Sequence, residues 1–271
     1  MNPSGIITLT TDFGLSDPYV GIMKGVILSI NPEARIIDIT HHVSAGDIGQ
    51  ASSILFDAYR FFPEGTIHLG VVDPGVGGER RPIMVITGSH FLIGPDNGLF
   101  WPVIFADKVV KLMHLTNESY FLSSISRTFH GRDIFAPVAA HVSRGVSPLE
   151  MGQTITDPVR LDLPICEQEG DILRGSIIRV DHFGNLLTSI PKKDVEKFFT
   201  RGSLLIRVGD ATINGVKGSY SEAKEGELIS LIGSSDHLEI AVNRGRACDG
   251  IGVESARLVG TRVELIVDGK C

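Results

Sequence analysis

The sequence predicts a two-part α/β chain. An N-terminal domain with a mainly parallel sheet flanked by helices precedes a smaller C-terminal antiparallel β-barrel. Three observations lead to this prediction. Strand-like and helix-like segments alternate through the first half, residues 145–170 carry prolines and little periodicity, and short strand-like runs follow residue 171. We therefore expect an N-terminal domain at residues 1–145, a linker at 146–170 and a C-terminal domain at 171–271.

The N-terminal half alternates between apolar strand patterns and helical patterns. Apolar runs rich in β-branched residues predict strands at residues 5–11, 35–39 and 65–72, and a hairpin at 83–87 and 90–93. Apolar residues at helical spacing predict helices at residues 19–30, 48–62 and 131–142. Asp17 before Pro18 is typical of a helix N-cap, and Ser44 with Asp47 resembles a capping box. Strands that alternate with helices favour a parallel sheet covered on both faces.

The C-terminal part consists of short strand patterns separated by turns. The predicted strands lie at residues 172–180, 185–189, 203–208, 228–232, 238–242 and 262–267. Their turns are marked by Gly184, Gly209, Gly215 and Gly233. So many short strands at close spacing predict a small antiparallel barrel or sandwich.

Charge and cysteine content limit the partners and the compartment. The formal net charge is −7 and no cluster of basic residues occurs, so we expect no nucleic-acid partner. Cys166, Cys248 and Cys271 are odd in number and lack CxxC spacing, which favours reduced thiols. No apolar run approaches the ~20 residues of a membrane span, and the first residues do not resemble a signal peptide. We expect a cytoplasmic protein with no membrane association.

Aspartates follow three of the predicted strands. Asp12 comes after the first strand, Asp73 after the third, and Asp181 after the first strand of the C-terminal domain. Such residues are often turn or cap residues, but ligands of open α/β sheets also bind beyond the carboxyl ends of the strands. Asp73 opens a glycine-rich turn, DPGVGGERR, whose glycines would carry Arg80 back toward Asp73.

Histidines supply further candidates. His130 lies at the predicted start of the helix at 131–142, where a histidine is otherwise a capping or packing residue. The pair His41-His42 could join Asp47 or Asp73 in a metal site, but adjacent residues at a strand end point in different directions. We therefore expect no metal.

Several segments, taken together and in order, carry a family resemblance. TDFG, VVDPGVGGERR, FHGRD, DHFGN and GSSDHLEIAVN resemble the S-adenosyl-L-methionine (SAM) hydrolases, or SAM hydroxide adenosyltransferases, which are related to the fluorinase and chlorinase. The resemblance spans about residues 6–267. It implies an N-terminal α/β domain, a C-terminal β-barrel and a homotrimer, with SAM bound between neighbouring subunits.

The resemblance also implies roles for individual residues. It places the catalytic set on Asp73, Arg80 and His130, although the adjacent Arg81 leaves open which arginine points inward. Ribose recognition falls on Asp12. Contacts to the adenine and to the methionine end fall on the remaining matched residues, Asp181, Asn185, Ser234, Ser235, Glu239 and Asn243.

The chemistry of the catalytic set agrees with hydrolysis of SAM to adenosine and methionine. Water would displace the methionine sulfur from the ribose C5′, with Asp73 as base or water holder, Arg80 as a fixed positive charge and His130 orienting the water. Sulfonium is a good leaving group, so no cofactor is needed. The alternatives are a SAM or adenosine binder without turnover, a halogenase whose halide Asp73 would repel, and a metal-dependent hydrolase that adds Asp12 and His41.

Overall fold

The computed structural model describes residues 1–200, 202–254 and 257–268, and the chain divides into two compact units at Leu161 and Asp162. This division falls inside the predicted linker at 146–170. The two ends of that stretch pair with strands: β7 (Gly152–Thr154) with one sheet and β8 (Glu167–Glu169) with the other.

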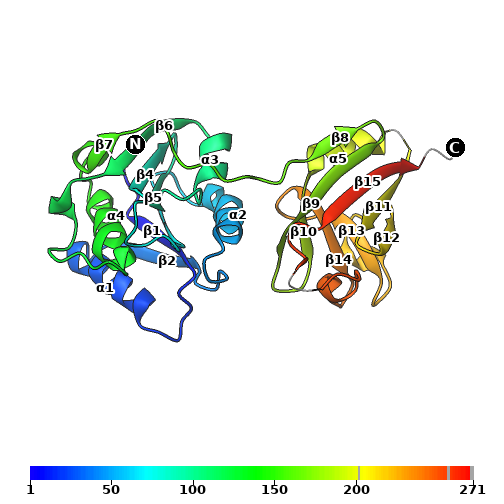
Figure 1. Cartoon of the computed structure of the whole chain (residues 1–271), viewed down its shortest axis with the longest axis horizontal. Coiled ribbons are helices and arrows are strands. Elements are labelled where there is room, and N and C mark those ends of the chain that lie inside the picture. The colour runs from blue at the N-terminus through cyan, green and yellow to red at the C-terminus, as the bar shows by residue number, and fades with distance from the viewer. Residues whose placement is uncertain (201, 255–256, 269–271) are drawn as a thin grey trace. The chain divides into compact units, whose positions relative to one another are not determined.

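The N-terminal unit is a mixed sheet whose first half is parallel (Figure 1). Its strand order is β2-β1-β3-β5-β4-β6-β7, and the pairs from β2 to β5 are parallel. The strands that precede β7 are β1 (Ile6–Thr11), β2 (Arg35–Thr40), β3 (Ile67–Val71), β4 (Pro82–Thr87), β5 (Phe91–Pro95) and β6 (Val109–Leu115). β4 and β5 form the predicted hairpin, and β4, β6 and β7 extend the sheet in antiparallel fashion.

Helices cover both faces of this sheet (Figure 1). The helices are α1 (Tyr19–Ile30), α2 (Ile48–Ala58), α3 (Trp101–Ala106) and α4 (Ala136–Ser143). One apolar core joins α1 and α4 to β1 and β3, with Met23 and Leu69 fully buried. A second core joins α2 and α3 to the opposite face, with Leu55 and Val85 fully buried. The sheet is therefore the middle layer, and only its strand ends are left for a site.

Several local predictions are wrong in detail. The N-cap of α1 is Pro18, not Asp17, and no side chain caps this helix. At α2 the cap is Asp47, which accepts a hydrogen bond from the Gln50 amide at 2.8 Å, so Ser44 is not the cap of a capping box. The predicted helix at 131–142 starts as a π-helical turn, Gly131–Phe135, before α4. The predicted helix at 48–62 ends at Ala58 and continues as a 3₁₀ turn.

The C-terminal unit is a strongly curved antiparallel sheet around a core of its own. The strand order is β12-β11-β15-β9-β10-β14-β13, with β8 added beside β9, and this barrel confirms the predicted architecture. Its remaining strands are β9 (Ile172–Val180), β10 (Leu186–Pro191), β11 (Ser203–Val208), β12 (Ala211–Asn214), β13 (Leu228–Ile232), β14 (His237–Val242) and β15 (Arg262–Asp268). Helix α5 (Lys192–Phe199) packs Val195 and Phe198 into the barrel core.

Candidate active site

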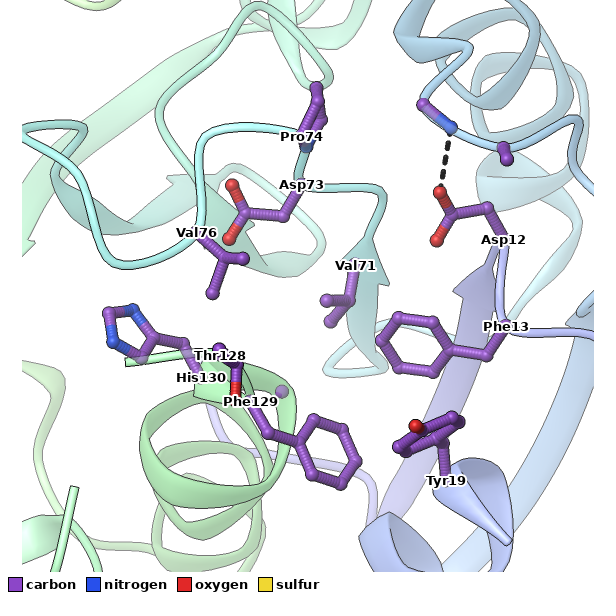
Figure 2. A pocket seen from close by; sticks show the side chains of 13 residues that line it. Asp12, Phe13, Tyr19, Val71, Asp73, Pro74, Val76, Thr128, Phe129 and His130 are labelled. Carbon is purple, nitrogen blue, oxygen red and sulfur yellow. Dashed lines mark hydrogen bonds between the residues drawn. The ribbon is translucent and has the colours of Figure 1, made fainter. Parts of the chain in front are cut away.

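The N-terminal unit has a pocket at the carboxyl ends of its parallel strands (Figure 2). Thr11 of β1 and Val71 of β3 pair in register, so the residues that follow them leave the sheet at the same edge. The pocket has a volume of about 540 Å³. Asp12 and Asp73, which follow strands as the sequence predicted, line it together with His130 from the start of a helical segment.

Asp73 and Arg80 form a buried ion pair within the glycine-rich turn. The Arg80 Nε atom donates to both carboxylate oxygens of Asp73, at 3.0 and 2.9 Å, and its Nη2 atom donates to Oδ2. The side chains are only 5% (Asp73) and 10% (Arg80) exposed. The guanidinium also lies over the Phe135 ring, 5.2 Å from its centroid. The turn thus returns Arg80 to Asp73 as predicted, and a fixed positive charge lies directly behind a carboxylate that lines the pocket.

Glycine is required at one position of this turn. Gly77 has a φ of +74°, and a Cβ atom there would lie 2.2 Å from the Arg127 carbonyl oxygen. Any other residue would push the turn away from the segment that leads to His130. The glycine therefore holds together the two segments that carry the candidate catalytic groups.

His130 completes the set through the same arginine. Nη2 of Arg80 lies 2.7 Å from Nδ1 of His130. Arginine can only donate, so Nδ1 is the acceptor, and the proton of the neutral imidazole is on Nε2. Burial and the Arg80 charge lower the pKa of His130, against smaller opposing effects of Asp73, Asp133 and a hydrogen bond with the Ser126 backbone. His130 is therefore a neutral hydrogen-bond donor at neutral pH.

The structure shows which of the two adjacent arginines contacts the candidate catalytic residues. Arg81 pairs with Asp96 at 2.6 Å and with Asp157 at 3.0 Å. It makes neither of the contacts that Arg80 makes with Asp73 and His130. Arg80 is therefore the arginine of this site, and Arg81, just before β4, links the chain there to the segment around residue 157.

Asp12 lies across the pocket from the ion pair. Its Oδ2 atom accepts a hydrogen bond from the Gly46 amide at 2.8 Å. Figure 2 shows the other carboxylate oxygen turned toward the pocket. One oxygen thus fixes the side chain and leaves the second for a ligand.

In the C-terminal unit, Asp181 and Asn185 close one turn on themselves. The Asp181 carboxylate accepts from the backbone amide of Asn185 at 2.8 Å and from its Nδ2 atom at 3.1 Å. Gly184 permits this turn with a φ of +85°. Asn185 also lines a second pocket, of about 550 Å³, which lies wholly within this unit.

Glu239 does not line that pocket but is hydrogen-bonded to Tyr220, which does. The Tyr220 hydroxyl donates to Glu239 Oε1 at 2.6 Å, and Tyr220 is one of the residues that line the pocket. Burial, more than any other cause, raises the pKa of Glu239, and nearby Asp181 adds to the effect. Burial and the bond to Glu239 raise the pKa of Tyr220. The pair places one carboxylate beneath the pocket wall.

The other predicted contact residues of this unit lie outside the pocket lining. Ser234 and Ser235 occupy the turn before β14, where the Ser235 carbonyl accepts from His237 Nδ1 at 2.9 Å. The amide of Asn243 donates to the Ala223 carbonyl at 2.7 Å, so this side chain holds a loop. None of these three residues lines either pocket, although Asn243 lies between Val242 and Arg244, which line the second.

Each pocket is also lined by residues that were not among the sequence-predicted site residues. Phe13, Tyr19 and Phe129 line the first, and Phe183, Tyr220, Arg244 and Arg246 line the second. One signal was available for Tyr220, an aromatic residue in a polar turn between strands. Arg244, with a φ of +56°, marks a sharp turn that the sequence pattern does not reveal.

The metal alternative finds no support in the described part of the chain. Within residues 1–200, 202–254 and 257–268, no group of three or more His, Cys, Asp or Glu side chains is placed to hold a metal ion. His41 instead bonds Thr11 Oγ1 at 2.8 Å and lies 3.1 Å from Asp38. None of the helices in these described residues has the length and apolarity needed to cross a membrane.

Two protein-family models together match most of the chain. Residues 7–152 match the model of the SAM hydroxide adenosyltransferase N-terminal domain, and residues 175–259 match that of the C-terminal domain. A solved structure of an uncharacterized conserved protein from Thermotoga maritima superposes with a TM-score of 0.90 at 36% identity, covering 96% of this chain and 99% of that one.

Curated relatives carry enzyme names. An (R)-S-adenosyl-L-methionine hydrolase from Salinispora tropica is 37% identical, over 93% of this chain and 96% of that protein. One of the same name from Thermus thermophilus is 34% identical, over 90% and 94%. A fluorinase from Actinoplanes is 30% identical over 72% of this chain and 75% of its own length.

Proposed function

The chain belongs to the SAM hydroxide adenosyltransferase family, and from this we propose that it hydrolyses SAM to adenosine and L-methionine. We propose further that Asp73, Arg80 and His130 prepare the attacking water. The observation that carries this second step is the buried contact of one arginine with both a carboxylate and a neutral imidazole. The reaction is in-line displacement at the ribose C5′, and it breaks the bond from C5′ to sulfur.

The difficult partner in this reaction is the nucleophile. Neutral water attacks carbon poorly, whereas the sulfonium leaves as a neutral thioether without help from an acid. A base that takes the water proton contributes typically ~10²–10⁴-fold. Asp73 has that role in our proposal, because it is the carboxylate on the pocket side opposite Asp12.

In our proposal, Arg80 and His130 assist Asp73 in preparing the attacking water. The fixed charge of Arg80 favours negative charge on the attacking oxygen. His130 keeps its proton on Nε2, because Nδ1 already accepts from Arg80. Nε2 can orient the water by donating to its oxygen, in competition with the Ser126 backbone. Neither role requires a metal or redox cofactor, and we propose that none takes part.

The substrate contacts divide between the two units. Asp12 holds the ribose, and in the C-terminal unit Asp181, Asn185 and Glu239 bind the nucleoside or the methionine end, together with Ser234, Ser235 and Asn243. Each unit has a pocket of its own. As the resemblance of the sequence implies, we propose a homotrimer in which SAM lies between the N-terminal unit of one subunit and the C-terminal unit of its neighbour.

We also propose a cytoplasmic location. The free thiols of Cys166 and Cys248 are consistent with a reducing compartment. We propose no nucleic-acid partner, because the net charge is −7.

The proposed activity is tested by incubating the protein with SAM in ¹⁸O-water. Chromatography should yield adenosine and methionine in equal amounts, and mass spectrometry should find the label on the 5′-oxygen of adenosine. Parallel reactions with chloride or fluoride should give no 5′-halogenated nucleoside, since Asp73 repels an anion. Tight SAM binding without products would indicate a binding protein, and unlabelled adenosine would exclude attack by water at C5′.

A further inference from the structure

Three aromatic side chains meet in the wall of the N-terminal pocket: Phe13, Tyr19 and Phe129, here called the aromatic cluster. The Phe129 centroid lies 5.8 Å from that of Phe13 and 5.2 Å from that of Tyr19, with interplanar angles of 75° and 83°. Phe13 and Tyr19 are 5.9 Å apart. We propose that this cluster recognises the sulfonium group of SAM and selects the cation over neutral thioether nucleosides. The inference rests on the proposed function.

The position of the cluster suits the leaving group. In-line displacement requires the sulfur to lie on the side of C5′ opposite the attacking water. Figure 2 shows Asp73 and His130 on one side of the pocket and the aromatic cluster on the other. Asp12 directly precedes Phe13, so a ribose held by Asp12 has the cluster beside it. Water bound near Asp73 and His130 therefore directs the sulfur toward the rings.

The cluster supplies the type of contact that a sulfonium needs. The face of an aromatic ring attracts cations through its quadrupole, with an effect of roughly 2- to 30-fold in affinity. Among the described residues that line this pocket, the carboxylates are Asp12 and Asp73, and both are assigned to other groups. Tyr19 is 46% exposed, so its ring remains accessible to a ligand.

A cation already lies over one of these rings. The Arg132 guanidinium carbon is 5.3 Å from the Phe129 centroid. Its charge is compensated by the buried carboxylate of Asp133, whose Oδ1 accepts from Arg132 Nε at 2.6 Å. A further cavity of the N-terminal unit, of about 430 Å³, is lined by Arg132 together with all three aromatic residues. The three rings thus line both cavities, whereas Arg132 lines only this one, so the N-terminal pocket is left for the substrate.

The attraction acts mainly on the bound substrate. Positive charge on sulfur disappears as the bond to C5′ breaks, so the rings hold SAM more strongly than the neutral methionine product. We therefore expect loss of an aromatic ring to raise KM more than it lowers kcat, and to weaken selectivity for the cation. Simple apolar packing would treat the sulfonium and the thioether alike.

The experiment compares the affinities of SAM and S-adenosylhomocysteine, its neutral thioether. Both dissociation constants are measured by calorimetry in an Asp73→Asn background, which slows turnover, with and without Tyr19→Leu or Phe13→Leu. SAM affinity should fall roughly 2- to 30-fold, and S-adenosylhomocysteine affinity by clearly less. Tyr19→Phe keeps the ring and should retain the selectivity, and Phe105→Leu, at an aromatic residue outside the pocket lining, should change neither constant.

Two results are distinguished by this design. If both affinities fall by the same factor while the wild-type protein still makes adenosine, the cluster is only apolar packing and the inference is wrong. If the wild-type protein neither binds nor hydrolyses SAM, the proposed function fails first, and the role of the cluster fails with it. Melting temperatures of all variants separate either result from unfolding.

Discussion

Replacing Asp73 by Asn tests the proposed nucleophile chemistry most directly. The change keeps the side-chain volume and one acceptor oxygen for Arg80, but it removes the proton acceptor. We expect kcat to fall by ~10²–10⁴-fold, while KM changes little because the substrate contacts lie elsewhere. The lost hydrogen bonding to a charged, 10% exposed arginine should lower the free energy of unfolding by about 2 kcal/mol. Adenosine formation by chromatography and urea unfolding measure the two effects.

A neighbouring ion pair provides a matched control for that experiment. Asp96 accepts from Arg81 Nε at 2.9 Å and Nη2 at 2.6 Å, and it is 3% exposed. Asp96→Asn should therefore cost a similar free energy of unfolding and leave kcat within about threefold of wild type. Normal turnover of Asp73→Asn would remove Asp73 from the mechanism. An equal loss of kcat in Asp96→Asn would show that both variants act only by loosening the turn.

Further expectations concern affinity, pH and assembly. Asp12→Asn should weaken SAM binding about 10- to 100-fold, more than it lowers kcat, since a charge-assisted bond to the ribose is lost; an equal fall in both would contradict this. Because the pKa of His130 is lowered, the imidazole should stay neutral as the pH drops below 6.5. In a pH–rate profile, wild-type kcat should therefore decline only at lower pH, and His130→Asn should lack this decline. Burial, with a smaller contribution from His90, holds the pKa of His68 at about 3. The unfolded chain therefore binds more protons between about pH 6.5 and 3, so the free energy of unfolding should fall by up to ~1.4 kcal/mol for each unit by which the pH is lowered. His68→Gln should flatten that slope in urea unfolding at pH 7 and 5, and an unchanged slope would contradict it. Light scattering should find a trimer, and an active monomer would exclude a shared site.

The long periodic elements of the fold could be predicted from sequence, and the short ones could not. Helix α1 matches its predicted range, because its apolar residues repeat at helical spacing over several turns. Helix α3 has six residues and begins at Trp101-Pro102, too short for any periodicity. β7 has three residues and forms by pairing with the edge of β6, and no local sequence pattern indicates such a pairing. Helix α5 is mostly charged, and its Val195 and Phe198 become meaningful only against the barrel core.

The candidate site could be predicted only in part, because some of its contacts are local in the sequence and others are not. The order of strands placed Asp12 and Asp73 at one edge, and the glycines indicated that Arg80 returns to Asp73. The choice between Arg80 and Arg81 depended on Asp96, a partner 15 residues along the chain, and Asp157, 76 residues along. Contacts at such separations are consequences of the fold. The sequence pattern alone therefore left both arginines open.

Arg80 explains why the three proposed catalytic groups act as one unit. Its planar guanidinium directs Nε to both oxygens of Asp73 and shares Nη2 between Asp73 and His130. A lysine ammonium is a point charge without this fork, so it could neutralise Asp73 but could not fix the imidazole tautomer in the same geometry. The Phe135 ring beneath the guanidinium and the close approach at Gly77 hold the fork in place before substrate binds. Groups that are already oriented need little rearrangement at the transition state, and this is how a buried ion pair can serve catalysis.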